Sequence, residues 1–409
     1  MWKPSFETSE KIFGILLGLA FASLFFGQAL IHFVGFLFLI ALLVIRPRLP
    51  WIAPFWWLVA FFLWENLSNY LGPYHGDGLK GAGISYHFLI IFLPLSLVTI
   101  NYVYLLRYIT VGAASSAALI WLQALIGIAW HSPPWRINWH GGHLFDRSPG
   151  FNGRPWVIQF NHSIITLAIL PFIKWKESRH WLLITGLFSG VVLPQIRAVL
   201  AAFVAGLGIQ FLFSKSSEDK KQTVRRLLLF IAIASMLAGT VAALRPDFFD
   251  QIMSANGRDK IFAASFEIVK KYPITGIGGG KHFKENYKQG WVDLGRHTNP
   301  PNYLEGIGHT HSDYLLLLVR HGWPGLLLWL GFVLHLSLFV WKHGNRQEKI
   351  VFMSLVAMHQ IAGLMETYLD YSNTIYALFL CYGLALHGPI KRYQAGKSQD
   401  LQSGPVAEK

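Results

Sequence analysis

Three ionisable side chains alternate along one short stretch of the chain, and these are His309, His311 and Asp313. Arg320 follows in the same stretch, GHTHSDYLLLLVRHGWPGLLLWLGF, which then becomes apolar enough to enter a membrane. The stretch ends a polar loop of more than sixty residues in a chain that is otherwise mostly apolar. This clustering predicts a functional site at a membrane face.

The H-x-H-x-D pattern is compatible with two kinds of chemistry. On an extended segment, alternate residues point the same way and can bind a metal ion. From Asp313 onward, however, the sequence reads as a helix up to Gly322, and we find no complete second set of ligands. A histidine at a helix start is better suited to act as a general base or proton shuttle. We therefore expect no metal site; the alternative is an interfacial histidine without a catalytic role.

Two arginines could bind an anion. Arg197 interrupts the apolar run PQIRAVLAAF, where an arginine at a helix centre costs about 2.5–3.5 kcal/mol. It either snorkels to the interface or uses its planar guanidinium to hold phosphate oxygens. Arg258 lies before a predicted amphipathic helix at 261–271, where its charge would add to the positive field at the N-terminus of the helix and attract an anion. The alternative is that Arg258 pairs with Asp259 in solvent.

The composition is that of a polytopic membrane protein. Hydrophobic residues make up 53% of the 409 residues and charged residues only 14%, whereas soluble proteins have about 25% charged residues. The net charge of +14 comes mostly from cations that flank apolar segments, so we expect contacts with membrane lipids and no nucleic acid. The only cysteine, Cys381, lies in an apolar run, which excludes a disulfide framework.

Apolar windows predict about twelve membrane-spanning helices, all-α in class. The segments at 181–193 and 196–213 are read as a hairpin of two short helices, because basic segments precede and follow the pair. Pro194, Gln195 and Arg197 then lie near its tip. The windows are 10–27, 28–45, 51–68, 84–100, 104–130, 156–173, 181–193, 196–213, 224–244, 322–341, 349–366 and 371–388.

The positive-inside rule places both termini in the cytoplasm, with 20 of the 35 Lys and Arg residues on that side. Nine of the others belong to one long outer loop, 245–308. Its segment ITGIGGGKHF contains glycines that could bring backbone amides close to an anion, which is a weak signal. The segment 131–155 is a second outer loop with Arg154 at its end, and the tail after Arg392 reads as disordered.

The motifs PQIRAVLAAF, GRDKIF, PITGIGGGKHF and HTHSDYLLLLVRHGWPGL occur in an order that resembles the superfamily of O-antigen ligases and polymerases. The motif resemblance is strongest over about 195–335. It implies a GT-C-like membrane glycosyltransferase of the Gram-negative inner membrane, with its active site on the periplasmic side. Ser312 and Ile196 depart from the residues that the family often has at these positions, and this leaves the subfamily open.

The resemblance implies inverting transfer of a glycan from undecaprenyl diphosphate to a hydroxyl, without a metal ion or other cofactor. We expect His311 to be the general base, with His309 second, while Arg197 and Arg258 neutralise the diphosphate. The side chains expected to contact substrates are those of His309, Arg154, Asp313 and Arg320.

Within this superfamily we favour a ligase with a lipid A core acceptor, because the single large loop lies late in a compact chain. A polymerase or a protein O-oligosaccharyltransferase of the same superfamily are the alternatives. A secondary transporter is the rival from another class, but the chain shows no internal repeat and its charges gather at one face. The expected organisation is spans 1–9 at 1–244, a periplasmic catalytic loop at 245–321, spans 10–12 at 322–390 and a cytoplasmic tail at 391–409.

Overall fold

The computed structural model describes residues 5–47, 49–74, 85–126, 128–131, 136–139, 155–173, 179–194, 196–213, 258–279, 283–292 and 310–402. These residues are almost entirely helical. The helices are α1 (Phe6–Ser23), α2 (Gln28–Ile45), α3 (Phe55–Leu71), η2 (Ser85–Ile91), α4 (Phe92–Leu95), α5 (Tyr102–Ile126), α6 (Pro155–Ile169), η4 (Leu170–Phe172), α7 (Arg179–Val192), α8 (Arg197–Phe213), α11 (Arg258–Lys271), α12 (Phe283–Val292), α14 (Asp313–His343), α15 (Arg346–Met365) and α16 (Ser372–Gln402).

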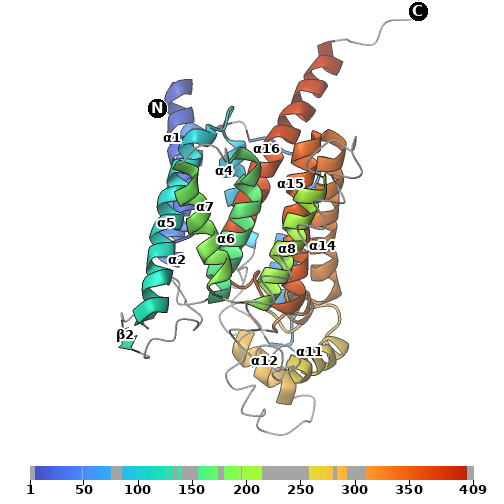
Figure 1. The fold of residues 1–409 in the computed structure, drawn as a ribbon. Coiled ribbons are helices and arrows are strands. Elements are labelled where there is room, and N and C mark those ends of the chain that lie inside the picture. Colours follow the sequence, from blue (N-terminus) through green and yellow to red (C-terminus); the bar gives the residue numbers. More distant parts are fainter. Residues whose placement is uncertain are drawn as a thin grey trace, which may run out of the picture.

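The long helices run side by side, and the two ends of the bundle differ (Figure 1). Both termini lie at one end. The short helices α11 and α12 lie at the other, which we call the α11–α12 end. A short antiparallel hairpin of β1 (Ile128–His131) and β2 (Arg136–Trp139) follows α5 at this end as well. The two segments that were predicted to share the outer face therefore lie at the same end of the bundle.

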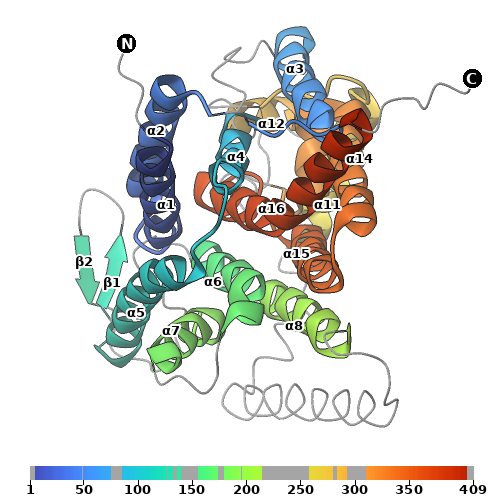
Figure 2. The ribbon, with the colours of Figure 1, turned by 90° about the horizontal axis from the view of Figure 1, so that it is seen from above.

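Helix α16 forms the centre of the bundle, as the view from above shows (Figure 2). It packs against η2, α4, α6, α14 and α15, and nearly every side chain from Thr374 to Leu386 is buried. Around it, α5 packs on α7, α8 on α15 and α3 on α14. The apolar residues of α16 therefore contact protein on all sides, as expected of a helix without a polar face.

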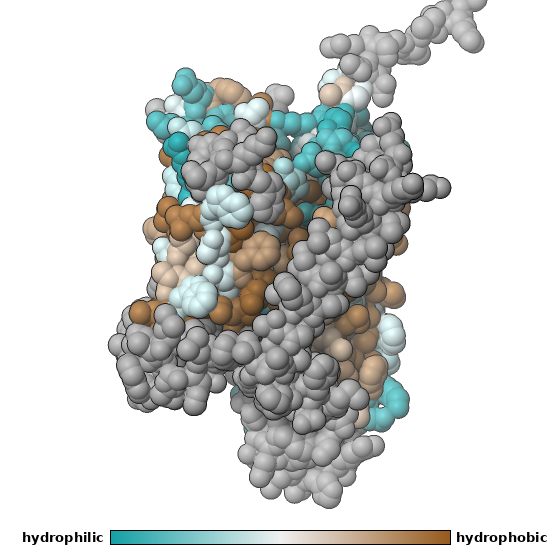
Figure 3. All heavy atoms as spheres, viewed as in Figure 1, coloured by the Kyte–Doolittle hydropathy of each residue, from teal (hydrophilic) through white to brown (hydrophobic). Residues whose placement is uncertain are grey.

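Among the described residues, four helices are long and apolar enough to cross a membrane by length and composition, namely those at Gln28–Ile45, Tyr102–Leu122, Asp313–His343 and Arg346–Met365. Shorter apolar helices occupy Trp156–Phe172, His180–Val192 and Ala198–Phe213. The surface carries hydrophobic residues along the helices and hydrophilic residues at the end that holds the termini (Figure 3). This pattern is that of a membrane protein, in which apolar side chains face lipid.

Four predicted windows differ from the helices observed. The window 371–388 belongs to α16, which continues to Gln402, so the described part of the tail that was read as disordered after Arg392 is helical. The window 84–100 contains the 3₁₀ helix η2 followed by α4, together roughly 20 Å long and thus shorter than a bilayer core. The window 104–130 ends early, because α5 stops at Ile126 and β1 follows. The window that was to begin at residue 322 belongs to α14, which begins at Asp313. The window 224–244 lies outside the described residues.

The predicted hairpin at 181–213 is confirmed as two helices, α7 and α8, joined by a turn. Gln159 of α6 binds both sides of this turn: its Nε2 donates to the carbonyl of Val191 at 2.6 Å, and its Oε1 accepts from the N–H of Ile196 at 2.6 Å. A side chain from a third helix thus satisfies backbone groups that the turn leaves without partners. This contact fixes the backbone from which α8 starts.

Candidate active site

The connection between α15 and α16, residues 366–371, is where polar side chains of the α11–α12 end converge. We call it the α15–α16 loop; its sequence is ETYLDY. It is held against α6, because the ring of Tyr368 stacks on that of Phe160 with centroids 4.2 Å apart. Three residues at and just before the first turns of α14 contact this loop: His311, Asp313 and Arg320.

His311 contacts Glu366 of the α15–α16 loop. Its Nδ1 lies 3.1 Å from Oε1 of the carboxylate, and the two side chains are 23% and 9% exposed. A carboxylate only accepts hydrogen bonds, so in the neutral imidazole Nδ1 carries the hydrogen and Nε2 has the lone pair. A partly accessible imidazole oriented by a buried carboxylate is an arrangement that suits a general base.

The backbone of His311 is left-handed, with φ at 52°. This conformation is uncommon outside glycine and costs about 1–3 kcal/mol. Polar contacts on both sides maintain it: Thr310 Oγ1 donates to the carbonyl of Ser312 at 2.8 Å, and Ser312 Oγ donates to the carbonyl of Gly363 at 3.1 Å. Strain of this kind concentrates at functional sites.

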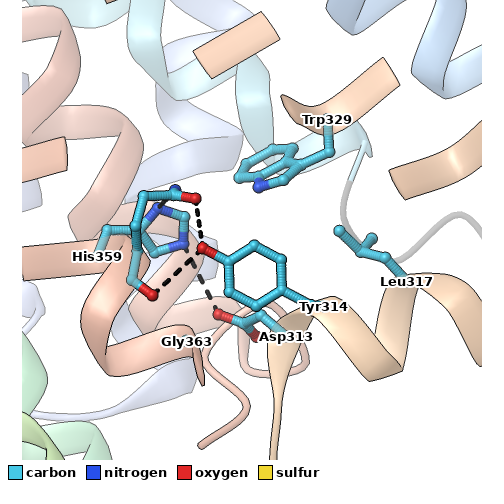
Figure 4. A pocket seen from close by; sticks show the side chains of 7 residues that line it. Asp313, Tyr314, Leu317, Trp329, His359 and Gly363 are labelled. Carbon is cyan, nitrogen blue, oxygen red and sulfur yellow. Dashed lines mark hydrogen bonds and ion pairs between the residues drawn. The ribbon is translucent and has the colours of Figure 1, made fainter. Parts of the chain in front are cut away.

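Asp313 is buried at the first position of α14. Its Oδ1 accepts hydrogen bonds from the N–H groups of Tyr368 and Leu369, both at 2.8 Å, and its Oδ2 lies 3.7 Å from Nε2 of His359. Figure 4 shows the small pocket beside this pair. It is lined by Asp313, Tyr314, Leu317, Trp329, His359, Gln360 and Gly363.

Arg320, two turns further along α14, joins α12 to the α15–α16 loop. Its guanidinium forms an ion pair with Asp370 and lies 4.2 Å from the centre of the Phe283 ring of α12. Its side chain is only 9% exposed. The charge of Arg320 is therefore balanced within the protein, and the substrate contact expected of it stays a prediction.

Helix α14 is kinked at Gly322, where φ is 65° and ψ is −169°. Pro324 follows and has no N–H, so the last residues before the kink have carbonyls without helical partners. The turn after α11 supplies the missing donors. The N–H of Ile277 donates to the carbonyl of Val319 at 2.8 Å, and the N–H of Gly278 donates to the carbonyl of Arg320 at 3.1 Å. In return, Trp323 N–H donates to the carbonyl of Pro273 at 2.9 Å. The kink is thus the docking site of α11 on α14.

The glycine-rich turn was expected to bring amides close to an anion, and its described part does something else. The four N–H groups from Gly276 to Gly279 donate to Tyr272 O, Val319 O, Arg320 O and Asn69 Oδ1 at 3.1, 2.8, 3.1 and 2.6 Å. These amides bind the protein itself, which corrects the expectation for residues 276–279. The glycines are needed instead because a side chain at Gly276 would meet the carbonyl of Val319 at 2.5 Å.

Helices α11 and α12 are joined by a buried hydroxyl pair. Tyr287 of α12 lies 2.9 Å from Ser265 of α11, and it also donates to the carbonyl of Ile261 at 3.3 Å. Burial raises the pKa of Tyr287 to about 12, so its hydroxyl stays neutral and continues to donate. The predicted helix at 261–271 is confirmed within α11, where Ile261, Ile268 and Val269 are buried and Lys270 is exposed; Phe266, an apolar residue of the predicted pattern, is exposed as well.

Arg197 is the first residue of α8, at the turn that Gln159 holds. The neighbour of Gln159, Phe160, stacks on Tyr368 of the α15–α16 loop. One turn of α6 therefore connects the start of α8 to the loop that contacts His311. Arg258 is likewise the first residue of α11. The side chains of both arginines lie outside the described part of the structure.

His309 and Arg154 also lie outside the described residues. Sequence reasoning missed Glu366 and Asp370, the two carboxylates that meet His311 and Arg320. A signal was available, because both occur within five residues between two apolar windows of a chain that has only 21 acidic residues. Among the residues that the structure describes, no three His, Cys, Asp or Glu side chains group together as metal ligands would.

Comparison with known proteins supplies a family for this site. Residues 181–330 match the family model described as O-antigen ligase. The matched range contains Arg197, Arg258 and His311 and ends within α14, before the α15–α16 loop. No curated protein matches the chain. Residues 181–330 therefore resemble the O-antigen ligase family, which agrees with the superfamily that the sequence motifs suggested.

Proposed function

We propose that this protein is an O-antigen ligase of a Gram-negative inner membrane. It transfers a glycan from undecaprenyl diphosphate to the lipid A core oligosaccharide, and its α11–α12 end faces the periplasm. The family match over residues 181–330 supports this class of enzyme. The twelve-span, GT-C-like organisation, with both termini in the cytoplasm, is part of the same proposal.

The observation that carries the proposal is the contact between His311 and Glu366. Transfer to a hydroxyl needs a base that removes a proton as the oxygen attacks. Hydrogen bonding of Nδ1 to the Glu366 carboxylate assigns the lone pair to Nε2 and stabilises the imidazolium that forms. The 23% exposure of the His311 side chain keeps it within reach of an acceptor.

The proposed step is a direct displacement. The acceptor oxygen forms a bond to the anomeric carbon while its proton passes to Nε2 of His311. The bond from the anomeric carbon to the diphosphate oxygen breaks, and its electron pair leaves with undecaprenyl diphosphate. The configuration at the anomeric carbon inverts, and side chains supply both the base and the neutralising charges, so the step uses no metal ion or nucleotide sugar.

The leaving diphosphate gains negative charge near the lipid boundary, and Arg197 and Arg258 are proposed to neutralise it. Each residue begins a helix, and helix N-termini favour anions. Electrostatic stabilisation of a developing charge in a dry site can contribute about 3–4 kcal/mol. His309, Arg154 and Arg320 remain proposed substrate contacts.

Replacing Arg197 by lysine tests the paired phosphate contact. Arg197→Lys keeps the charge but loses the planar fork of donors, so we expect kcat to fall about 100-fold. Glycan transfer by purified protein in nanodiscs measures this. Arg346→Lys is the matched control, because Arg346 is also the first residue of a helix, α15. Near-normal turnover of Arg197→Lys would contradict the phosphate contact and indicate that Arg197 only extends to the membrane interface.

Replacing Glu366 by glutamine tests the orientation of His311. Glu366→Gln keeps the shape of the side chain but removes the charge that stabilises the imidazolium, so kcat should fall about 10- to 100-fold with little change in KM. Glu348→Gln is the control, because Glu348 caps the opposite end of α15, where its Oε2 accepts from the N–H of Asn345 at 2.7 Å. Equal losses in the two variants would contradict the assignment.

The acceptor distinguishes a ligase from its relatives. Purified protein is offered lipid A core, a second lipid-linked glycan and a peptide rich in serine and threonine, each with the same donor. A ligase labels the core lipid. Elongation of the second glycan would identify a polymerase, and labelling of the peptide would identify a protein glycosyltransferase. Failure to transfer to any acceptor, with the donor bound intact, would reject the enzyme class.

A further inference from the structure

The carboxylate of Asp313 joins three separate elements. It belongs to the first turn of α14, it accepts the N–H groups of Tyr368 and Leu369 in the α15–α16 loop at 2.8 Å, and it faces His359 of α15 at 3.7 Å. Successive backbone N–H groups that converge on one point form a site for an anion. Here an internal carboxylate occupies that site.

Packing leaves Asp313 no room to reach a substrate. Its side chain is buried, and a Cβ added at Gly363 would lie 2.8 Å from its Oδ2, so the carboxylate lies directly on the α15 backbone. The two amides that it binds follow Glu366 by two and three residues. Fixing their positions also fixes where the Glu366 carboxylate lies relative to His311.

His359 is held on its other side. Its Nδ1 lies 2.9 Å from Nε2 of Gln360 and 3.4 Å from the hydroxyl of Tyr382, and its ring meets the Trp329 ring edge to face with centroids 5.8 Å apart. Figure 4 shows the ring pointing at Asp313. Oδ2 of Asp313 and Nε2 of His359 have no hydrogen-bond partner among the described residues, because the 3.7 Å between them exceeds hydrogen-bond distance. The two buried polar atoms therefore face each other without a hydrogen bond.

We propose that Asp313, which faces His359 and binds the amides of Tyr368 and Leu369, is a positioning residue that sets the α15–α16 loop and so presents Glu366 to His311. The proposal rests on the function proposed above. It replaces the substrate contact that the sequence suggested for Asp313. It also explains why the loop, which lies beyond the range matched by the family model, takes part in the site.

The test compares two substitutions at Asp313. Asp313→Asn retains one oxygen that can accept both amides, whereas Asp313→Ala retains none. We expect kcat to fall about 10-fold in Asp313→Asn and about 100-fold in Asp313→Ala, with KM changed less than twofold. Hydrogen exchange at the amides of Tyr368 and Leu369 should accelerate in the same order. His359→Gln should show a smaller loss of the same kind, and it provides the measurement if Asp313→Ala does not fold.

A double-mutant cycle separates positioning from general stability. If Asp313 acts through Glu366, then Asp313→Asn adds less than about twofold to the loss already present in Glu366→Gln. Ser337→Ala is the matched control, because Ser337 also belongs to α14 but its hydroxyl donates to the carbonyl of Val333 at 2.7 Å. We expect it to keep full activity and unchanged exchange at residues 368 and 369.

Three results would overturn the inference: full activity of Asp313→Asn and Asp313→Ala, losses that multiply fully with Glu366→Gln, or unchanged amide exchange in the loop. Failure of the proposed function has a different signature. In that case His311→Ala and Glu366→Gln would themselves keep wild-type transfer, whatever the Asp313 variants do.

Discussion

His311→Ala should lower glycan transfer about 10²- to 10⁴-fold, the range that a positioned general base contributes. This corresponds to about 3–5 kcal/mol of transition-state stabilisation. The variant removes the imidazole whose Nδ1 lies 3.1 Å from the Glu366 carboxylate. Binding of the lipid-linked donor should remain, because the arginines proposed to hold the diphosphate are unchanged.

A second substitution separates the chemistry from the backbone of His311. Asparagine tolerates the left-handed conformation observed there, with φ at 52°, but has no basic nitrogen. His311→Asn should therefore lose as much activity as His311→Ala while keeping its thermal unfolding midpoint. His335→Ala is the control on α14, the helix that begins two residues after His311; His335 accepts a hydrogen bond from Trp57 at 3.0 Å. Wild-type kcat in both His311 variants would refute the base assignment.

Of all the glycines that the structure describes, Gly322 is the one whose replacement by alanine should destabilise the fold most. The backbone there has φ 65° and ψ −169°, a region that only glycine occupies readily and that costs other residues about 1–3 kcal/mol. The added Cβ would also lie 2.0 Å from the carbonyl oxygen of Ile274. The turn at 273–278 must then move away from α14 and lose the three backbone hydrogen bonds at the kink. We expect a loss of about 3–5 kcal/mol in total.

Tryptophan fluorescence during thermal unfolding in detergent measures this loss. Gly14→Ala is the matched control, because Gly14 lies in α1 and an added Cβ would have no heavy atom within 4 Å. Alanine there should be neutral or stabilising by up to about 1 kcal/mol. An unfolding midpoint for Gly322→Ala within 2 °C of that of the control would contradict the role assigned to the kink, since a loss of about 3–5 kcal/mol should move the midpoint of a chain of this length by about 3–6 °C.

Several features followed from local sequence signals. The hairpin at α7 and α8 was predicted from Pro194 and its basic flanks, and α11 from its apolar spacing. The start of α14 at Asp313 and the break near Gly322 followed from residue types alone. Local signals succeed here because helix starts, helix breaks and amphipathic faces depend on neighbours within one or two turns.

The hydrogen-bond partners of the site residues could not be predicted from local sequence signals. Glu366 lies 55 residues after His311 and Asp313 lies 55 residues before Tyr368, while Gln159 is 37 residues from Ile196. Each contact depends on how α6, α14, α15 and α16 pack. The glycine-rich turn was likewise ambiguous, because the same residues can bind an anion or the backbone of a kinked helix, and only the packing decides between them.

By itself the sequence determined that the chain is a helical membrane protein, and its motifs pointed to the family and to His311, Arg197 and Arg258. These properties depend on residue type and order, and both can be read directly from the sequence. Only the tertiary structure decided that Glu366 orients His311, that Arg320 is balanced by Asp370, and that Asp313 binds the α15–α16 loop. The physical reason is that hydrogen bonds act over about 3 Å, so the partners of a side chain depend on distances in space that sequence separation does not reveal.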